Sequence, residues 1–218
     1  MSESFALAFA TLFATVSPID VSAIFAAITT KSGQEARRHM ALRGVMIASL
    51  VLFTFAFIGD WLLHALGISL AALRTAGGIM LLMMGLDMVF ARMSSANAPT
   101  VQEQAEALGR EDVSVFPLAL PLIAGPGSMG AVILLMAQSK ADLMAQAGVI
   151  AALVLVMALT LGSLLASTQL NRLLGVTGMA VITRVMGVLL CALAVQFVFD
   201  GIMASGLIEA FARAMLKE

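Results

Sequence analysis

Charged side chains are scarce in this sequence. Asp, Glu, Lys and Arg make up 11% of the 218 residues, whereas 61% are hydrophobic and the mean hydropathy is +1.04. A water-soluble protein usually carries charge on about a quarter of its residues. We therefore expect much of the exterior to face lipid. The net charge of −1 provides no basic field for nucleic acid, and the high hydrophobicity excludes a disordered chain.

Cysteine is also scarce. Cys191 is the single cysteine and lies in an apolar run, which excludes an internal disulfide and a secreted disulfide scaffold. No Lys or Arg precedes the first apolar stretch, so the start of the chain lacks the basic region of a signal peptide. We expect the first hydrophobic segment to be retained.

Six apolar stretches follow one another along the chain. Each is long enough to cross a bilayer, which takes about 20 apolar residues, and none shows the alternation of a strand. We predict an all-α polytopic membrane protein with two halves, residues 1–91 and 113–218, joined by a polar cytoplasmic linker at 92–112. The predicted spans are 5–30, 44–66, 68–91, 113–137, 143–169 and 176–207.

The basic residues predict an orientation, because cytoplasmic loops carry an excess of Lys and Arg. With the N-terminus outside, the cytoplasmic side collects Lys31, Arg37, Arg38, Arg43, Arg92, Arg110 and Arg172. The outer side then holds Lys140, Arg213 and Lys217. We predict that both termini lie outside.

The two halves repeat one order of features. In the first half, a helix broken at Ser17–Asp20 is followed by an uninterrupted helix and then by a helix with the motif Arg74-Thr-Ala-Gly77. In the second half, a helix broken at Gly125–Ser128 is followed by an uninterrupted helix and then by a helix with the motif Arg184-Val-Met-Gly187. Because each half has three spans, the second half would have the opposite orientation in the membrane to the first. Inverted repeats with matching broken helices are typical of alternating-access transporters with a midplane site. Alternatively, these prolines and glycines only allow close packing.

A broken helix frees backbone groups that lipid cannot satisfy. The helix that restarts presents N–H groups suited to a carboxylate, and the helix that ends presents carbonyls suited to an ammonium group or a small cation. A zwitterionic amino acid matches both ends. The predicted binding residues are Ser17, Pro18, Asp20, Ser22, Arg74, Gly125, Pro126, Gly127, Ser128, Arg184 and Gln196. The serines could instead cap their own helices.

Charged side chains inside the spans should face the bundle interior, a partner or an interface, because charge at mid-bilayer is costly. These are Asp20, Arg74, Asp87, Arg184 and Asp200. Asp20 could form a structural salt bridge with an arginine, act as a protonatable coupling group or bind an ammonium group. Arg184 lies two turns inside its helix, and we predict that it supports the break in the fourth span. Arg74 is predicted to do the same for the first span.

Residues 117–128, PLALPLIAGPGS, resemble the central signature of the MarC family of six-span bacterial inner-membrane proteins. The resemblance implies two three-helix repeats and a transporter of small neutral amino acids, related to LysE-type exporters, in the bacterial inner membrane with periplasmic termini. It implies no cofactor, with Na⁺ or H⁺ as a candidate coupling ion. The first-helix pattern departs from the family, since polarity lies at Asp20 rather than before Pro18. Further similar segments are 67–69, 74–79, 181–187, 194–197 and 200–202.

Other functions remain open at this stage. A cation or proton channel could be lined by Asp20, Asp87 and Asp200, and drug efflux is a weaker alternative. An intramembrane enzyme is disfavoured because His39 and His64 are predicted on opposite membrane faces. The expected partners are a small-molecule substrate and the bilayer. Small-residue stripes, Ala72 with Ala76 and Thr183 with Gly187 and Cys191, suit packing within the chain or a homo-oligomer.

Overall fold

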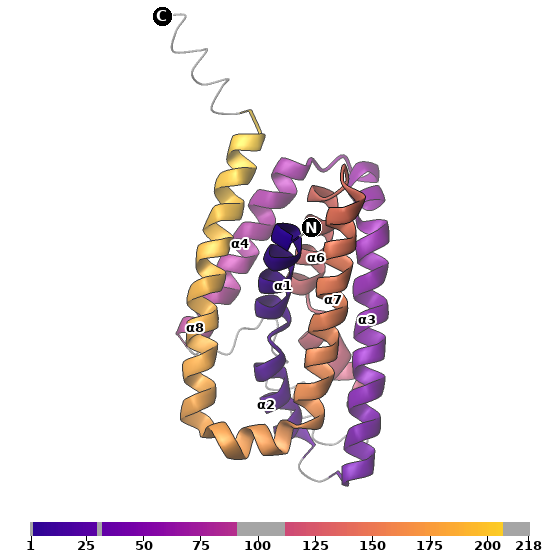
Figure 1. Cartoon of the computed structure of the whole chain (residues 1–218), viewed down its shortest axis with the longest axis vertical. Coiled ribbons are helices and arrows are strands. Elements are labelled where there is room, and N and C mark those ends of the chain that lie inside the picture. The colour runs from indigo at the N-terminus through magenta and orange to yellow at the C-terminus, as the bar shows by residue number, and fades with distance from the viewer. Residues whose placement is uncertain (1, 30–31, 91–111, 207–218) are drawn as a thin grey trace, which may run out of the picture.

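The computed structural model describes residues 2–29, 32–90 and 112–206, and these form helical elements with no strand (Figure 1). Five helices are long and apolar enough to cross a membrane, and a sixth span results when the bent pair Ser114–Ile123 and Pro126–Gln138 counts as one. The prediction of an all-α membrane protein is confirmed. The predicted linker lies outside the described residues except for Asp112.

Three spans form the first half, and the first of them is broken. Span one consists of α1 and α2, which are separated at Ser17. Pro18 begins α2, where its missing N–H removes no helical hydrogen bond. Spans two and three are the single helices α3 and α4. The bounds are α1 Ser2–Val16, α2 Pro18–Ile28, α3 Gln34–Ala65 and α4 Leu70–Val89.

The second half also begins with a broken span. Span four consists of η1 and α6, bent by 54° at their junction. Span five is α7. Span six is α8, whose backbone leaves the helical conformation at Gly175 with φ 62° and ψ −179°, a combination that favours glycine. The bounds are η1 Ser114–Ile123, α6 Pro126–Gln138, α7 Leu143–Leu165 and α8 Ser167–Ala204.

The first part of span four is less regular than the sequence suggested. Phe116 and Leu120 have extended backbones, with φ near −130° and ψ near 125°, and the peptide bonds to Pro117 and Pro121 are cis. A residue before proline is disfavoured in the helical conformation because the proline ring crowds its backbone. The apolar run 113–137 therefore consists of a distorted π-helical segment followed by a regular α-helix.

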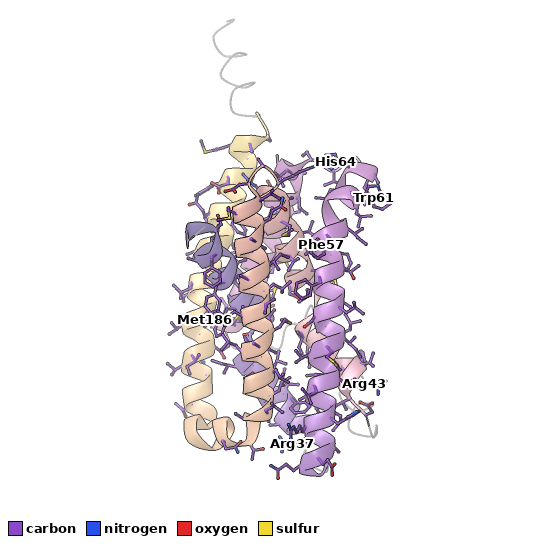
Figure 2. All side chains as sticks on the ribbon, turned by 45° about the vertical axis from the view of Figure 1, so that its right-hand side comes forward. Arg37, Arg43, Phe57, Trp61, His64 and Met186 are labelled. Atoms are coloured by element: carbon purple, nitrogen blue, oxygen red, sulfur yellow. The ribbon has the colours of Figure 1, made fainter. Side chains whose placement is uncertain are left out.

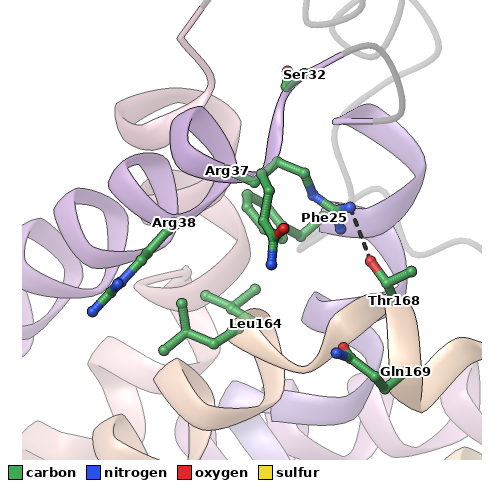
Figure 3. A pocket seen from close by; sticks show the side chains of 9 residues that line it. Phe25, Ser32, Arg37, Arg38, Leu164, Thr168 and Gln169 are labelled. Carbon is green, nitrogen blue, oxygen red and sulfur yellow. Dashed lines mark hydrogen bonds between the residues drawn. The ribbon is translucent and has the colours of Figure 1, made fainter.

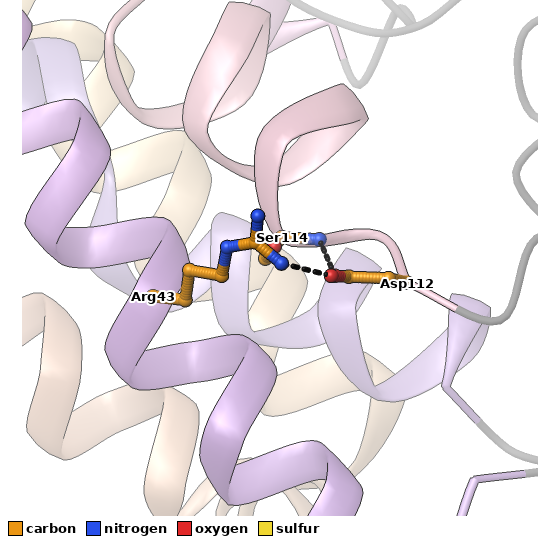
Figure 4. Close-up of polar contacts among 3 residues, drawn as sticks. All are labelled: Arg43, Asp112 and Ser114. Atoms are coloured by element: carbon orange, nitrogen blue, oxygen red, sulfur yellow. Dashed lines mark hydrogen bonds and ion pairs between the residues drawn. The ribbon is translucent and has the colours of Figure 1, made fainter.

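The basic residues Arg37 and Arg43 of α3 lie at one end of the bundle (Figure 2). Arg37 donates to Thr168 of α8 at 2.9 Å, and Arg43 pairs with Asp112 at 2.6 Å just before η1 (Figure 4). The starts of α3, η1 and α8 therefore share one end of the bundle, here called the linker end. Figure 2 shows Arg37 and Arg43 at this end and His64 at the other.

Further residues can be assigned to the two ends. Lys140 lines a cavity of about 440 Å³ with His64 and Ser69, away from the linker end. The described N-terminal residues and the C-terminal end of α8 also lie towards that opposite end (Figure 1). The described N-terminal residues and the end of α8 therefore share the end of the bundle opposite Arg37 and Arg43 (Figure 1 and Figure 2). Lys31, Arg92, Arg110, Arg213 and Lys217 fall outside the described residues, and the side chain of Arg172 is not described.

The Arg43–Asp112 pair provides a first test. Contacts with Ser114 and then the charge of Arg43 hold the pKa of the Asp112 carboxyl below its usual range. Because both side chains are nearly half exposed, we expect Asp112→Asn to lower the free energy of unfolding by less than about 1 kcal/mol. A lowered pKa contributes stability above the unfolded value of about 3.9, and this is lost as pH falls through the folded value. In thermal unfolding, the difference in stability between the wild type and Asp112→Asn should shrink below pH of about 4. A difference that stays constant across this range would contradict the prediction.

Glycines bring α4 and α8 close together. A Cβ atom on Gly78 would lie 2.7 Å from the Ala194 carbonyl oxygen, and one on Gly85 would lie 2.9 Å from that of Gly187. Gly78 thus faces Ala194, whereas Gly85 faces Gly187. Because residue numbers fall along α8 as they rise along α4, the two helices are antiparallel. Cys191 also faces Gly85. The predicted stripe of Gly187 and Cys191 therefore packs within the chain.

The spans of the two halves contact one another in a matching pattern. Span one packs against span five, through α1 and α2 on α7, and span four packs against span two, through η1 and α6 on α3. Likewise, span one packs against span six, and span four against span three. Spans one and four also touch, as α1 packs on α6 and α2 on η1.

Candidate functional site

The break in span one forms around a strained serine. Ser17 has φ 49° and ψ 64°, the one left-handed non-glycine residue among those described. This conformation costs about 1–2 kcal/mol for an L-residue. The next residue, Pro18, cannot donate a backbone hydrogen bond to α1. Together they separate α1 from α2 and place Asp20 in the first turn of α2.

Hydroxyl groups from two spans hold the Asp20 carboxylate. Ser17 Oγ donates to Asp20 Oδ2 at 2.6 Å, and Thr183 Oγ1 of α8 donates to Oδ1. The start of α2 also favours a negative charge here, because its free N–H groups form the positive end of the helix. No Lys or Arg pairs with Asp20 within the described part of the chain. The predicted alternative of a salt bridge to an arginine is therefore not found there.

A small cavity lies against this carboxylate. Its volume is about 10 Å³, close to the space that a single water molecule needs. An amino acid does not fit in a cavity of this size. The walls come from span one and α8: Phe13, Ser17, Pro18, Ile19, Asp20, Ile182, Thr183 and Met186.

Serine hydroxyls bond to backbone carbonyls beside both breaks. Ser128 Oγ lies 2.8 Å from the Ile123 oxygen and 3.0 Å from the Gly125 oxygen, at the junction of η1 and α6. Ser163 of α7 donates to the Pro18 oxygen at 2.9 Å. Ser22 donates to the Ile19 oxygen of its own helix at 2.7 Å. The predicted residues Ser22 and Ser128 are thus bonded to their own span.

The two breaks lie at a similar depth. They occur in antiparallel spans whose first and second parts pack on each other, α1 on α6 and α2 on η1. Gly125, Gly127 and Ser128 are buried, whereas Pro126 is exposed. The sequence prediction of a break in both spans is confirmed, and the two breaks belong to neighbouring parts of the bundle.

Two predicted site residues lie away from the breaks. Gln196 is 13 residues beyond Thr183 on α8, which is about 20 Å at 1.5 Å per residue, and it donates to Asp200 at 2.8 Å. Arg74 precedes Thr75, which faces Gly201 of α8, so it lies at that same remote level. Its buried Nε has no partner among the described residues. The structure brings neither side chain to Asp20.

Arg184 does not make the contact predicted for it. Its side chain is exposed and forms no hydrogen bond or ion pair with a described residue, so it does not hold the carbonyls at the second break. Successive helix residues point about 100° apart. Because Thr183 faces α2, Arg184 faces elsewhere. The contact of α8 with Asp20 comes from Thr183, which was predicted only as part of a small-residue stripe.

The family of the chain can be assigned from its sequence, because the similarity extends over most of its length. The profile of the MarC family integral membrane proteins matches residues 2–205. The chain belongs to the MarC family. Its similarity to curated MarC-family relatives extends across archaea and bacteria. A UPF0056 membrane protein of Methanocaldococcus jannaschii is 35% identical over 92% of this chain and 96% of its own length.

Further relatives cover similar shares of this MarC-family chain. A UPF0056 membrane protein of Archaeoglobus fulgidus is 33% identical, over 91% of this chain and 92% of the relative. The UPF0056 membrane protein YhcE of Escherichia coli is 33% identical over 88% of each. No solved structure matches the chain. The resemblance drawn from residues 117–128 is confirmed at the level of the family.

Proposed function

We propose that this MarC-family protein is a secondary transporter of small neutral amino acids such as alanine, glycine or serine. The observation that carries the proposal is the closed site at Asp20. A carboxylate at a helix break is held by hydroxyls from two different spans, beside a cavity of about 10 Å³. A site of this kind opens when α8 separates from span one.

The groups at the break suit both ends of an amino acid. The Asp20 carboxylate can accept an ammonium group once Thr183 moves away, and the free N–H groups at the start of α2 can bind a carboxylate. Phe13, Ile182 and Met186 surround the rest of the cavity. These apolar walls favour a short uncharged side chain over a charged or large one.

We further propose that the halves are inverted repeats that exchange access between the two membrane faces. The matching contacts of the two halves support this, as do the breaks in spans one and four. The cluster of Arg37, Arg38 and Arg43 supports a cytoplasmic linker end with both termini outside, in a bacterial inner membrane. Transport by alternating access then uses the two breaks as its centre.

A second candidate is a cation-coupled or cation-conducting role for Asp20. The two hydroxyls around its carboxylate would suit Na⁺ or a transferred proton. A pore lined by three acids fits less well, because Asp200 lies 17 residues beyond Thr183 on α8, about 25 Å away. We therefore place a cation with the substrate at Asp20 rather than in a separate pathway.

Counterflow in proteoliposomes tests the proposal. Vesicles loaded with unlabelled alanine should accumulate labelled alanine, glycine or serine transiently, because a carrier exchanges substrate across the membrane. Empty liposomes and vesicles loaded with a large cationic amino acid serve as controls. Cation flux without any counterflow would replace the carrier with a channel, and the absence of both would end the proposal.

A further inference from the structure

A larger cavity opens at the linker end. Its volume is about 510 Å³, within the range of small-ligand sites. It lies between the end of α2, the start of α3, the end of α7 and the start of α8 (Figure 3). The residues around it are Phe25, Ser32, Gln34, Arg37, Arg38, Leu164, Leu165, Thr168 and Gln169.

The arginines of this cavity have no anionic partner in the described part of the chain. Arg37 donates to Thr168 at 2.9 Å and Ser167 at 3.0 Å, and its guanidinium lies over the Phe25 ring at 5.8 Å. All three partners are uncharged. Arg38 is exposed and makes no described ion pair. No carboxylate is among the described residues that line the cavity, so the two positive charges have no described counter-charge there.

The cavity combines this charge with an apolar wall. Phe25 of α2 and Leu164 at the end of α7 are buried, and the neighbouring Leu165 is 46% exposed. The apolar helix α7 ends at Leu165. Because spans end near the lipid headgroups, the polar part of the cavity lies at headgroup level and its apolar part at the level of the first acyl carbons.

We propose that this cavity binds the phosphate of an anionic phospholipid. The planar fork of an arginine matches phosphate oxygens, and basic pockets between spans on the cytoplasmic side are suited to such headgroups. The apolar wall distinguishes a lipid from free phosphate, because only a lipid has acyl chains to place against Leu164 and Leu165. The proposal does not depend on the transport function.

The test measures lipid binding to the purified full chain in detergent. Phosphatidylglycerol should raise the melting temperature and remain bound in native mass spectrometry, whereas phosphatidylcholine should do so at least about fivefold more weakly. Inorganic phosphate alone should neither stabilise the protein nor displace the lipid. Equal binding of both lipids, or displacement by phosphate, would overturn the proposal.

Two variants and one matched control locate the site. Arg37→Gln and Arg38→Gln should each weaken phosphatidylglycerol binding about fivefold or more. Arg38→Gln removes no described contact, so it should fold normally even if Arg37→Gln loses its bonds to α8. Arg43→Gln lies on the same helix at the same end but outside the cavity, so it should bind like wild type. An equal loss in Arg43→Gln would show general surface attraction instead.

Discussion

Asp20→Asn is expected to reduce amino acid exchange by about a hundredfold while the protein still folds. Asparagine has nearly the same shape and still accepts one hydroxyl hydrogen bond, but it offers no negative charge to an ammonium group or coupling ion. Removing one partner of a buried charge pair costs about 2–5 kcal/mol, and 1.4 kcal/mol corresponds to a factor of ten. Counterflow in proteoliposomes and thermal unfolding in detergent measure the two effects separately.

Two further variants separate the site from general effects of charge. Asp200→Asn alters an acid of α8, the helix that also carries Thr183. Asp200 is bonded to Gln196 and lies away from the break, so exchange should stay near the wild-type rate. Thr183→Val keeps the branched shape but removes the hydroxyl that closes the site, so exchange should change less than with Asp20→Asn. Full exchange by folded Asp20→Asn would show that this carboxylate is not the binding group.

The spans and their breaks could be predicted because they depend on local chemistry. Length and lack of charge mark a membrane helix, and Pro18 or Gly125-Pro126 interrupts one wherever it occurs. The turn between spans five and six was harder. The structure ends α7 at Leu165, before the predicted 169, and begins α8 at Ser167. The backbone of α8 then breaks at Gly175, next to the predicted start of span six at 176. Residues 166–175 carry few charges, so composition alone could not place that turn.

The residues around Asp20 could be predicted in part for a similar reason. Ser17, Pro18 and Asp20 belong to one short segment, and their proximity follows from the sequence. Thr183 was not predicted, because its contact with Asp20 depends on which face of α8 packs against α2. The neighbouring Arg184 was predicted instead, because a buried charge needs a partner. That reasoning holds only for a buried side chain, and Arg184 is exposed. Tertiary packing decides which residues of α8 are buried.

The same dependence on packing makes two adjacent glycines of α4 unequal. A Cβ on Gly77 would meet the Leu134 side chain at 3.6 Å, an ordinary contact. A Cβ on Gly78 would lie 2.7 Å from the Ala194 oxygen and 2.9 Å from the Val198 nitrogen. These are backbone atoms of α8, which cannot turn aside as a side chain can. Gly78 therefore sets how closely α4 and α8 approach.

Gly78→Ala is expected to lower the free energy of unfolding by about 1–3 kcal/mol, because the added methyl forces the two helices apart. Gly77→Ala should leave stability unchanged or raise it by up to about 1 kcal/mol, since alanine is the better helix former. Thermal unfolding of both variants in the same detergent measures the difference, with chain, helix and substitution type held constant. Equal melting temperatures for the two variants would mean that α4 and α8 can separate freely, and that their glycine contacts contribute little to the stability of the bundle.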